Sequence, residues 1–184
     1  MQNVQGHSYT KSRAKTFDLV ITAMLAALIF AGTLINIKLP FGQGGLVHLG
    51  TSILFIAAIL FGPKKGALAG AIGMGLFDIL GGWAIWAPTT IISRLLQGYI
   101  VGKIAWAKGQ RGDNVGLNIL AAVASMPVMM AVYYIGQGIM YNNWVAPLAS
   151  IPGDLIQNVV GLLIAIPVCI VLRKTPYFQK KFNG

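Results

Sequence analysis

The sequence predicts an all-α integral membrane protein, folded as one bundle of six transmembrane helices over residues 1–184. Hydrophobic residues make up 56% of the chain and charged residues only 10%, whereas a soluble domain carries about 25% charged residues. The four acidic residues are all aspartates, which is too few to cover a water-facing surface. Long apolar runs and a one-sided distribution of lysine and arginine indicate the same fold class.

Six apolar runs are separated by polar or glycine-rich segments. A helix needs about 20 residues to cross the hydrocarbon core of a bilayer. The runs show no alternation of polar and apolar residues with period two, which favours helices over the strands of a membrane barrel. The second run is short, so we expect it to begin below the membrane surface or to borrow from the turn-like segment 37–47. The predicted spans are 18–36, 46–61, 66–83, 88–107, 116–140 and 153–172.

The lysines and arginines determine the predicted orientation of the spans. Lys38 falls on one side, Arg94 lies within a span, and the other twelve cations fall on the opposite side, which the positive-inside rule places in the cytoplasm. Residues 1–16 are then a basic cytoplasmic segment, 17–174 the bundle and 175–184 a basic cytoplasmic tail. The net charge of +10 is explained by cytoplasmic segments that lie beside anionic lipid. Nucleic-acid binding is not expected, because the positive charges are scattered over four separate segments. The twelve cations are Lys11, Arg13, Lys15, Lys64, Lys65, Lys103, Lys108, Arg111, Arg173, Lys174, Lys180 and Lys181.

Two opposite charges lie at matching depth in neighbouring predicted helices. Asp78 precedes Trp83 by five residues, and Arg94 follows Pro88 by six. At 1.5 Å per residue, both lie about 7–9 Å below the outer end of the bundle. Because an unpaired charge in hydrocarbon is costly, we expect the two to be buried within the bundle and to pair. The pair could be structural or could contact a ligand, and the residues alone leave both possibilities open.

Further polar residues collect at the same level, while the inner halves of the helices are almost entirely Leu, Ile, Val, Ala and Gly. A path for protons or ions would need polar groups through the full thickness of the membrane. The distribution therefore predicts a pocket that is open to the outside and closed below. The additional polar residues are His48, Gln97, Tyr133, Tyr134, Gln137, Asn142, Asn143, Asp154, Gln157 and Asn158.

Some members of this group also have a structural explanation. Trp83 and Trp86 could belong to an interfacial aromatic belt. His48 could cap its helix, and Asp154 could be the N-cap of the last helix. The convergence of several elements at one depth, rather than any single residue, favours a binding site.

Small residues recur at helical spacing in two settings. Ala23, Ala27 and Ala31 follow one another at intervals of four along the first predicted helix, and such a stripe lets another helix approach closely. Its partner could be another protein or this chain's own bundle. The glycine-containing pairs are expected to pack inside the bundle; they are Gly66–Gly70, Ala71–Gly75 and Gly98–Gly102.

Motifs of catalysis and of nucleotide binding are not found. The segment GPKKGAL lacks the spacing of a phosphate-binding loop, and no H-E-x-x-H pattern or cysteine and histidine cluster occurs. With one cysteine, two histidines and no glutamate, neither a metal site nor nucleophilic catalysis is predicted, and Cys169 is expected to be a core residue. We therefore predict no catalytic residue, no metal and no cofactor bound by this chain.

Four segments resemble a known family. They are the stripe AMLAALIFA, the block LPFGQGGLVHLGTSILFIAAILFGPKKGALAGAIG, and the motifs GGWAIWAP and PGDLIQNVVG. Over residues 17–174 the chain resembles the substrate-binding S components of energy-coupling factor (ECF) transporters, which import vitamins across the bacterial plasma membrane. Within that family it is most similar to members for hydroxymethylpyrimidine or pyridoxine. Pantothenate and riboflavin remain alternatives, and thiamin carriers are less similar.

The resemblance implies partners and a ligand site. Ala23, Ala27 and Ala31 would dock onto a transmembrane coupling protein, the T component, which carries two ATPase subunits that use ATP. The 37–47 loop, the 83–88 loop and the outer ends of helices four to six would enclose one vitamin-sized molecule. A stand-alone secondary transporter or channel, with Asp78 and Arg94 as its ion site, is the competing hypothesis. The predicted ligand-binding residues are Gln43, His48, Asp78, Trp83, Trp86, Arg94, Gln97, Tyr133, Gln137, Asp154 and Asn158.

Overall fold

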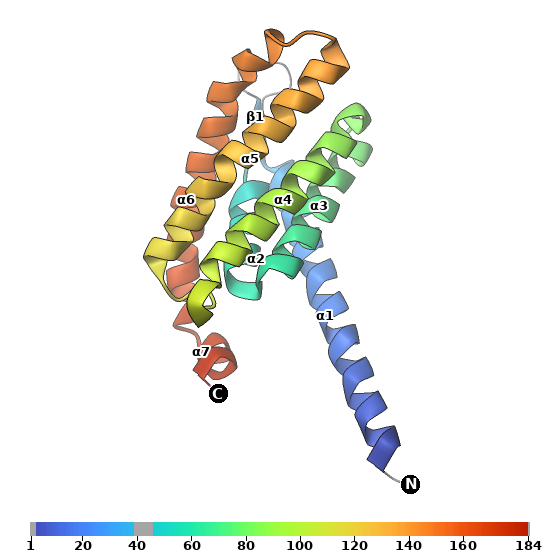
Figure 1. The fold of residues 1–184 in the computed structure, drawn as a ribbon, viewed down its shortest axis with the longest axis vertical. Coiled ribbons are helices and arrows are strands. Elements are labelled where there is room, and N and C mark those ends of the chain that lie inside the picture. The colour runs from blue at the N-terminus through green and yellow to red at the C-terminus, as the bar shows by residue number, and fades with distance from the viewer. Residues whose placement is uncertain (1–2, 39–45, 184) are drawn as a thin grey trace.

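A computed structural model describes residues 3–38 and 46–183 as an all-helical bundle with one small hairpin (Figure 1). The helices are α1 (Asn3–Leu34), α2 (Gly50–Phe61), α3 (Pro63–Leu80), α4 (Ala87–Ala105), α5 (Val115–Tyr141), α6 (Ile151–Arg173) and α7 (Pro176–Asn183). Strands β1 (Asn36–Lys38) and β2 (Leu46–His48) pair antiparallel, with Asn36 opposite His48. Short 3-10 turns η1 (Ala84–Trp86), η2 (Ala107–Gly109) and η3 (Ala146–Ser150) lie in the connections.

Local sequence signals explain several helix boundaries. Gly62 adopts a φ of 90° between α2 and α3, a conformation that favours glycine, and Pro63 begins α3, where the missing N–H costs nothing. The side chain of Asn114 accepts a hydrogen bond of 3.0 Å from the backbone N–H of Leu117 and so caps the start of α5. Helix α5 ends at Tyr141, and the residue that caps it, Asn142, adopts the left-handed conformation.

Six predicted apolar runs correspond to α1–α6, with three differences. Residues 46–48 form a strand instead of the start of the second helix, because they pair with β1. Helix α1 extends back through the basic segment to Asn3, and the tail forms α7. Among the described residues, three segments are long and apolar enough to cross a membrane, namely Lys15–Leu34, Val115–Tyr141 and Ala146–Arg173.

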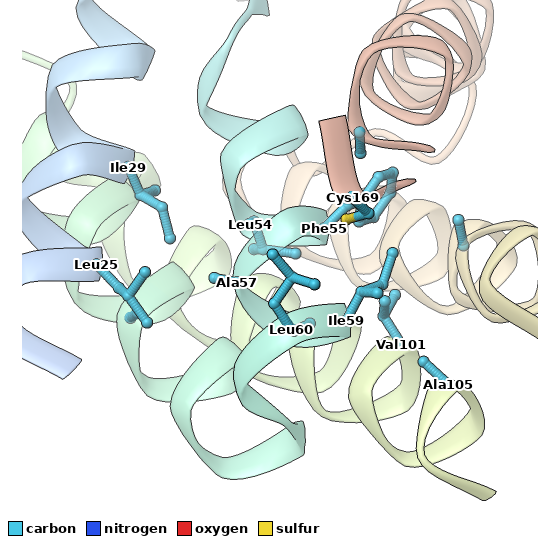
Figure 2. Close-up of a cluster of buried hydrophobic side chains, with 14 of the residues drawn as sticks. Leu25, Ile29, Leu54, Phe55, Ala57, Ile59, Leu60, Val101, Ala105 and Cys169 are labelled. Atoms are coloured by element: carbon cyan, nitrogen blue, oxygen red, sulfur yellow. The ribbon is translucent and has the colours of Figure 1, made fainter. Parts of the chain in front are cut away.

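Helix α2 lies in the middle of the bundle, which explains why 12 residues suffice for it. It contacts α1, α3, α4 and α6, and its Leu54, Phe55, Ile59 and Leu60 are fully buried. Figure 2 shows Ile59 beside Val101 of α4, and Phe55 beside Cys169 of α6. Cys169 belongs to the same cluster, as predicted.

The outer faces of the other helices carry large apolar side chains. Leu19 and Met24 of α1, Ile72 of α3, Ile139 of α5 and Leu163 of α6 are each about half exposed or more. A soluble monomer rarely leaves so much apolar surface uncovered. This surface is that of a membrane protein.

Glycines bring α3 close to α2 and α4. A methyl group added at Gly98 would lie 2.7 Å from the carbonyl oxygen of Gly66, and one added at Gly66 would lie 2.5 Å from the Cα of Ala58. Both distances are too short for real atoms, so the backbones of three helices touch at these positions. The glycines at Gly66–Gly70 and Gly98–Gly102 are buried within the bundle, which confirms that part of the prediction.

Two of the four aspartates form ion pairs at the end of the bundle that contains the α2–α3 and α4–α5 connections (Figure 1). Lys65 Nζ lies 2.8 Å from Asp18 Oδ1, and Arg173 Nε lies 3.0 Å from Asp113 Oδ1. Arg173 also donates to the carbonyl oxygen of Arg111. We call this end of the molecule the basic end.

Replacing Gly98 by alanine tests the close contact between α3 and α4. The added methyl group would force the two backbones apart, so we expect Gly98→Ala to lower the free energy of unfolding by about 1–3 kcal/mol. Thermal unfolding of the detergent-purified chain measures the effect. The matched control is Gly116→Ala near the start of α5, where the new methyl group meets only the Asn114 side chain at 3.2 Å. Equal unfolding temperatures for the two variants would contradict the contact.

Candidate functional site

A cavity opens at the end of the bundle opposite the basic end. Its walls come from the β1–β2 hairpin, α1, η1 and helices α3–α6. Its empty space, with the open mouth included, is about 650 Å³. The enclosed part of this space is about 80 Å³, whereas small-molecule sites in proteins fall in the range of about 300–1,000 Å³, so a vitamin-sized ligand would also have to occupy the open mouth.

Eight of the eleven residues predicted to bind ligand line this cavity. Gln97 and Asn158 are fully buried behind the wall, and Gln43 lies outside the described residues. Sequence reasoning did not include seven other lining residues in the ligand set. The eight are His48, Asp78, Trp83, Trp86, Arg94, Tyr133, Gln137 and Asp154, and the seven are Thr33, Leu46, Met74, Phe77, Thr90, Ser150 and Gln157.

Gln157 attaches the hairpin to α6. Its side-chain carbonyl accepts a hydrogen bond of 2.8 Å from the backbone N–H of His48, and its amide donates to the His48 carbonyl oxygen at 3.0 Å. The same amide nitrogen donates to Thr51 Oγ1 at 2.6 Å. The side chain therefore pairs with β2 as a neighbouring strand would. His48 ends β2 and does not open the second helix, contrary to the prediction, because its backbone is held in this extended pairing.

Three buried amide and guanidinium groups connect α4 to α6 behind the cavity. Arg94 Nη1 donates to Gln97 Oε1 at 2.7 Å, and Gln97 Nε2 donates to Asn158 Oδ1 at 2.7 Å. Asn158 Nδ2 in turn donates to the backbone carbonyl of Asp154 at 2.7 Å. We call these three side chains the Arg94–Gln97–Asn158 chain. It explains why Gln97 and Asn158 share the depth of the site without lining it.

The expected ion pair between Asp78 and Arg94 does not form. Both side chains line the cavity and are at least nine-tenths buried, yet the ion pairs between described residues do not include them. Arg94 is instead held by Gln97, and its guanidinium carbon lies 5.4 Å from the ring centre of Tyr133. Oδ2 of Asp78 has no hydrogen-bond partner among the described residues.

Aromatic side chains form the outer wall of the cavity. The ring of Trp86 lies 6.4 Å from that of Tyr133 and 6.1 Å from that of Tyr141. The Tyr133 hydroxyl is 3.0 Å from Thr90 Oγ1. At the mouth, Lys38 Nζ lies 5.6 Å from the centre of the Trp83 ring. Three of these aromatic residues, Trp83, Trp86 and Tyr133, line the cavity.

Helical spacing could have identified Thr90, which precedes Arg94 by four residues and so shares a helix face with a predicted residue. Gln157 was predicted to belong to the polar group but was not included among the ligand-binding residues. Ser150 donates a hydrogen bond of 2.9 Å to Gln137 Oε1, but it comes from η3, where spacing gives no guide. In the described part of the chain, no group of three or more His, Cys, Asp or Glu side chains could hold a metal ion.

The apolar outer faces and the polar cavity define a membrane protein with a pocket at one end of its helical bundle. Residues 13–174 match the family described as ECF-type riboflavin transporter, S component. The chain belongs to this family, whose members are transporter components and not enzymes. The resemblance found in the sequence is thereby confirmed.

One of three similar proteins is named as a transporter. The chain is 27% identical over 160 residues to the thiamine precursor transporter HmpT of Lactococcus lactis, a match that covers 85% of this chain and 88% of the relative. It is 32% identical over 142 residues to an uncharacterized protein of Pyrococcus woesei, covering 77% and 90% of the two chains. A UPF0397 protein of Vibrio atlanticus is 32% identical over 89 residues, about half of each chain.

Removing the Gln157 amide tests its role in holding the hairpin. In Gln157→Leu, the buried N–H and C=O of His48 lose their partners, and we expect a loss of about 1–3 kcal/mol in the free energy of unfolding. Thermal unfolding in detergent measures it. Gln110→Leu, at an exposed position near the basic end, is the control and should change stability by less than about 0.5 kcal/mol. If both variants unfold at the wild-type temperature, the hairpin does not depend on Gln157.

Proposed function

We propose that this chain is the high-affinity vitamin-binding subunit of an ATP-driven ECF importer, and that its ligand is hydroxymethylpyrimidine or pyridoxine. The observation that carries the proposal is the cavity, in which aromatic rings and buried polar side chains meet at one end of a lipid-facing bundle. The thiamine-precursor transporter among its relatives supports a small heterocyclic ligand. Pantothenate and riboflavin are the alternative ligands.

We further propose that the six helices α1–α6 cross a bacterial plasma membrane with both termini in the cytoplasm. The positions of the basic residues support this topology. Lys65, Arg111 and Arg173 all lie at the basic end, whereas Lys38 lies beside Trp83 of the cavity lining. Under the positive-inside rule the basic end faces the cytoplasm. The cavity then opens to the outside, where an imported vitamin arrives.

The alanine stripe supports a membrane partner. Ala23, Ala27 and Ala31 are all exposed, whereas Leu25 and Ile29 on the opposite face of α1 pack into the core. The described residues therefore do not cover the stripe, and a close helix contact within this chain does not account for it. We propose that the stripe docks onto the T component, which carries the two ATPase subunits.

Ligand identity can be tested by calorimetry on the purified chain. We expect one of five vitamins to bind: hydroxymethylpyrimidine, pyridoxine, pantothenate, riboflavin or thiamin. The strongest binder should be neutral or zwitterionic, because acidic and basic side chains share the cavity wall. The control is the same titration with Arg94→Gln, which changes a lining residue and should weaken binding. Failure of all five compounds would refute vitamin binding by this chain.

A bulky residue in the alanine stripe separates docking from binding. Ala27→Trp should leave ligand affinity near that of the wild type, because the stripe lies on an exposed helix face away from the cavity lining. Uptake by cells that carry the complete transporter should fall at least about tenfold, since the tryptophan keeps the partner helix from approaching. The matched control is Ala124→Trp at an exposed alanine of α5, which should change neither.

A transport assay on the purified chain in liposomes distinguishes an ECF subunit from a secondary transporter. A secondary transporter works alone, so the purified chain in liposomes would accumulate its ligand under an ion gradient without ATPases. Normal uptake by Ala27→Trp, or transport by the isolated chain, would contradict the docking proposal.

A further inference from the structure

Three buried polar atoms on the cavity wall lack a hydrogen-bond partner within residues 3–38 and 46–183. They are Nδ1 of His48, Oδ2 of Asp78 and Nε of Arg94. The three residues are 8%, 9% and 4% exposed, and all of them line the cavity. Because folded proteins satisfy nearly all buried polar groups, atoms of this kind mark where a ligand supplies the missing partners.

Two of the atoms have a fixed hydrogen-bonding character. An ionised carboxylate such as Asp78 only accepts hydrogen bonds, and the guanidinium of Arg94 only donates them. They do not satisfy each other, because Arg94 is held in place by Gln97, which is itself held by Asn158. The cavity lining therefore includes one unpartnered acceptor, on Asp78, and one unpartnered donor, on Arg94.

The surroundings of these atoms favour an uncharged, flat ligand. Arg94 and Asp78 carry opposite charges and both line the cavity, so a neutral molecule that bonds to both leaves no charge uncompensated. The rings of Trp86 and Tyr133 line the same cavity and offer flat faces for stacking. A ligand that matches the wall is a planar heterocycle with a donor and an acceptor on one edge.

We propose, resting on the proposed function, that the cavity selects an aminopyrimidine by one ring edge. The exocyclic amino group donates a hydrogen bond to Asp78, and the neighbouring ring nitrogen accepts one from Arg94. Hydroxymethylpyrimidine carries this edge. Pyridoxine has no amino group beside its ring nitrogen, and pantothenate has no ring, so the proposed edge favours hydroxymethylpyrimidine over these two ligands.

Paired ligands test the contact between the amino group and Asp78. Calorimetry on the full-length chain in detergent compares 4-amino-5-hydroxymethyl-2-methylpyrimidine with the analogue that lacks the amino group. The wild type should bind the amino compound at least about tenfold more tightly, because the analogue leaves the buried carboxylate without a donor. In Asp78→Ala, the ratio of the two affinities should fall to within about twofold, since the residue that reads the amino group is gone.

Asp154→Ala is the matched control, because Asp154 is the other carboxylate on the cavity wall. It should weaken both ligands alike and leave the ratio of affinities as in the wild type. If Asp78→Ala does not fold, Asp78→Asn replaces it. Its neutral amide keeps an acceptor but loses the charge-assisted bond, so the ratio should fall below the wild-type value.

The outcomes separate this inference from the proposed function. Equal affinities of the wild type for the two pyrimidines, or tighter binding of pyridoxine, would overturn the aminopyrimidine edge while leaving a vitamin-binding subunit. An unchanged ratio in the Asp78 variants, or an equal collapse of the ratio in Asp154→Ala, would overturn the role of Asp78. Binding of none of the five vitamins would remove both proposals.

Discussion

Charge in an apolar bundle must be compensated, and the rest of this structure depends on how that is done. Asp18 and Asp113 are paired with Lys65 and Arg173 at the basic end. These pairs lie near the surface, where an ion pair contributes at most about 1 kcal/mol. At the other end, Arg94 and Asp78 are buried without an ion pair between them. The bundle keeps Arg94 in place through two amides and leaves the carboxylate on the wall of a cavity. The result is a polar site at one end of a chain that is otherwise apolar.

The walls of the cavity are joined to one another by close backbone packing and by hydrogen bonds. The glycines of α3 and α4 bring backbones together, so these helices cannot shift apart without losing packing. The Arg94–Gln97–Asn158 chain ties α4 to α6, and Gln157 ties α6 to the hairpin. A preorganised site binds its ligand more tightly because less ordering is required on binding.

Composition and periodicity were sufficient to predict the helical membrane bundle and most of the cavity. Asp78, Arg94, Trp86 and Tyr133 could be placed together because helical rise gives the depth of each residue. The helical rise does not show which neighbouring residue a side chain contacts. The predicted Asp78–Arg94 pair was therefore wrong, and Gln97 and Asn158, which were predicted to bind ligand, do not line the cavity. The strand at 46–48 was also missed, because a three-residue apolar run carries no periodicity and its pairing with residues 36–38 is a tertiary contact.

The alanine stripe shows a second limit of prediction from the sequence. Spacing alone could not say whether Ala27 meets this chain or another, and the structure leaves it exposed. Exposure in a membrane protein is compatible with lipid as well as with protein. The small size of all three side chains favours a helix, since lipid would accept larger residues equally well.

The central claim is that the cavity wall, with its fixed guanidinium and its free carboxylate oxygen, holds one vitamin-sized heterocycle. Native mass spectrometry of the full-length chain, released from detergent after incubation with an equimolar mixture of the five vitamins, tests this claim most directly. We predict a single bound molecule per chain with the mass of hydroxymethylpyrimidine. A chain that carries no vitamin, or that carries several interchangeably, would contradict the claim.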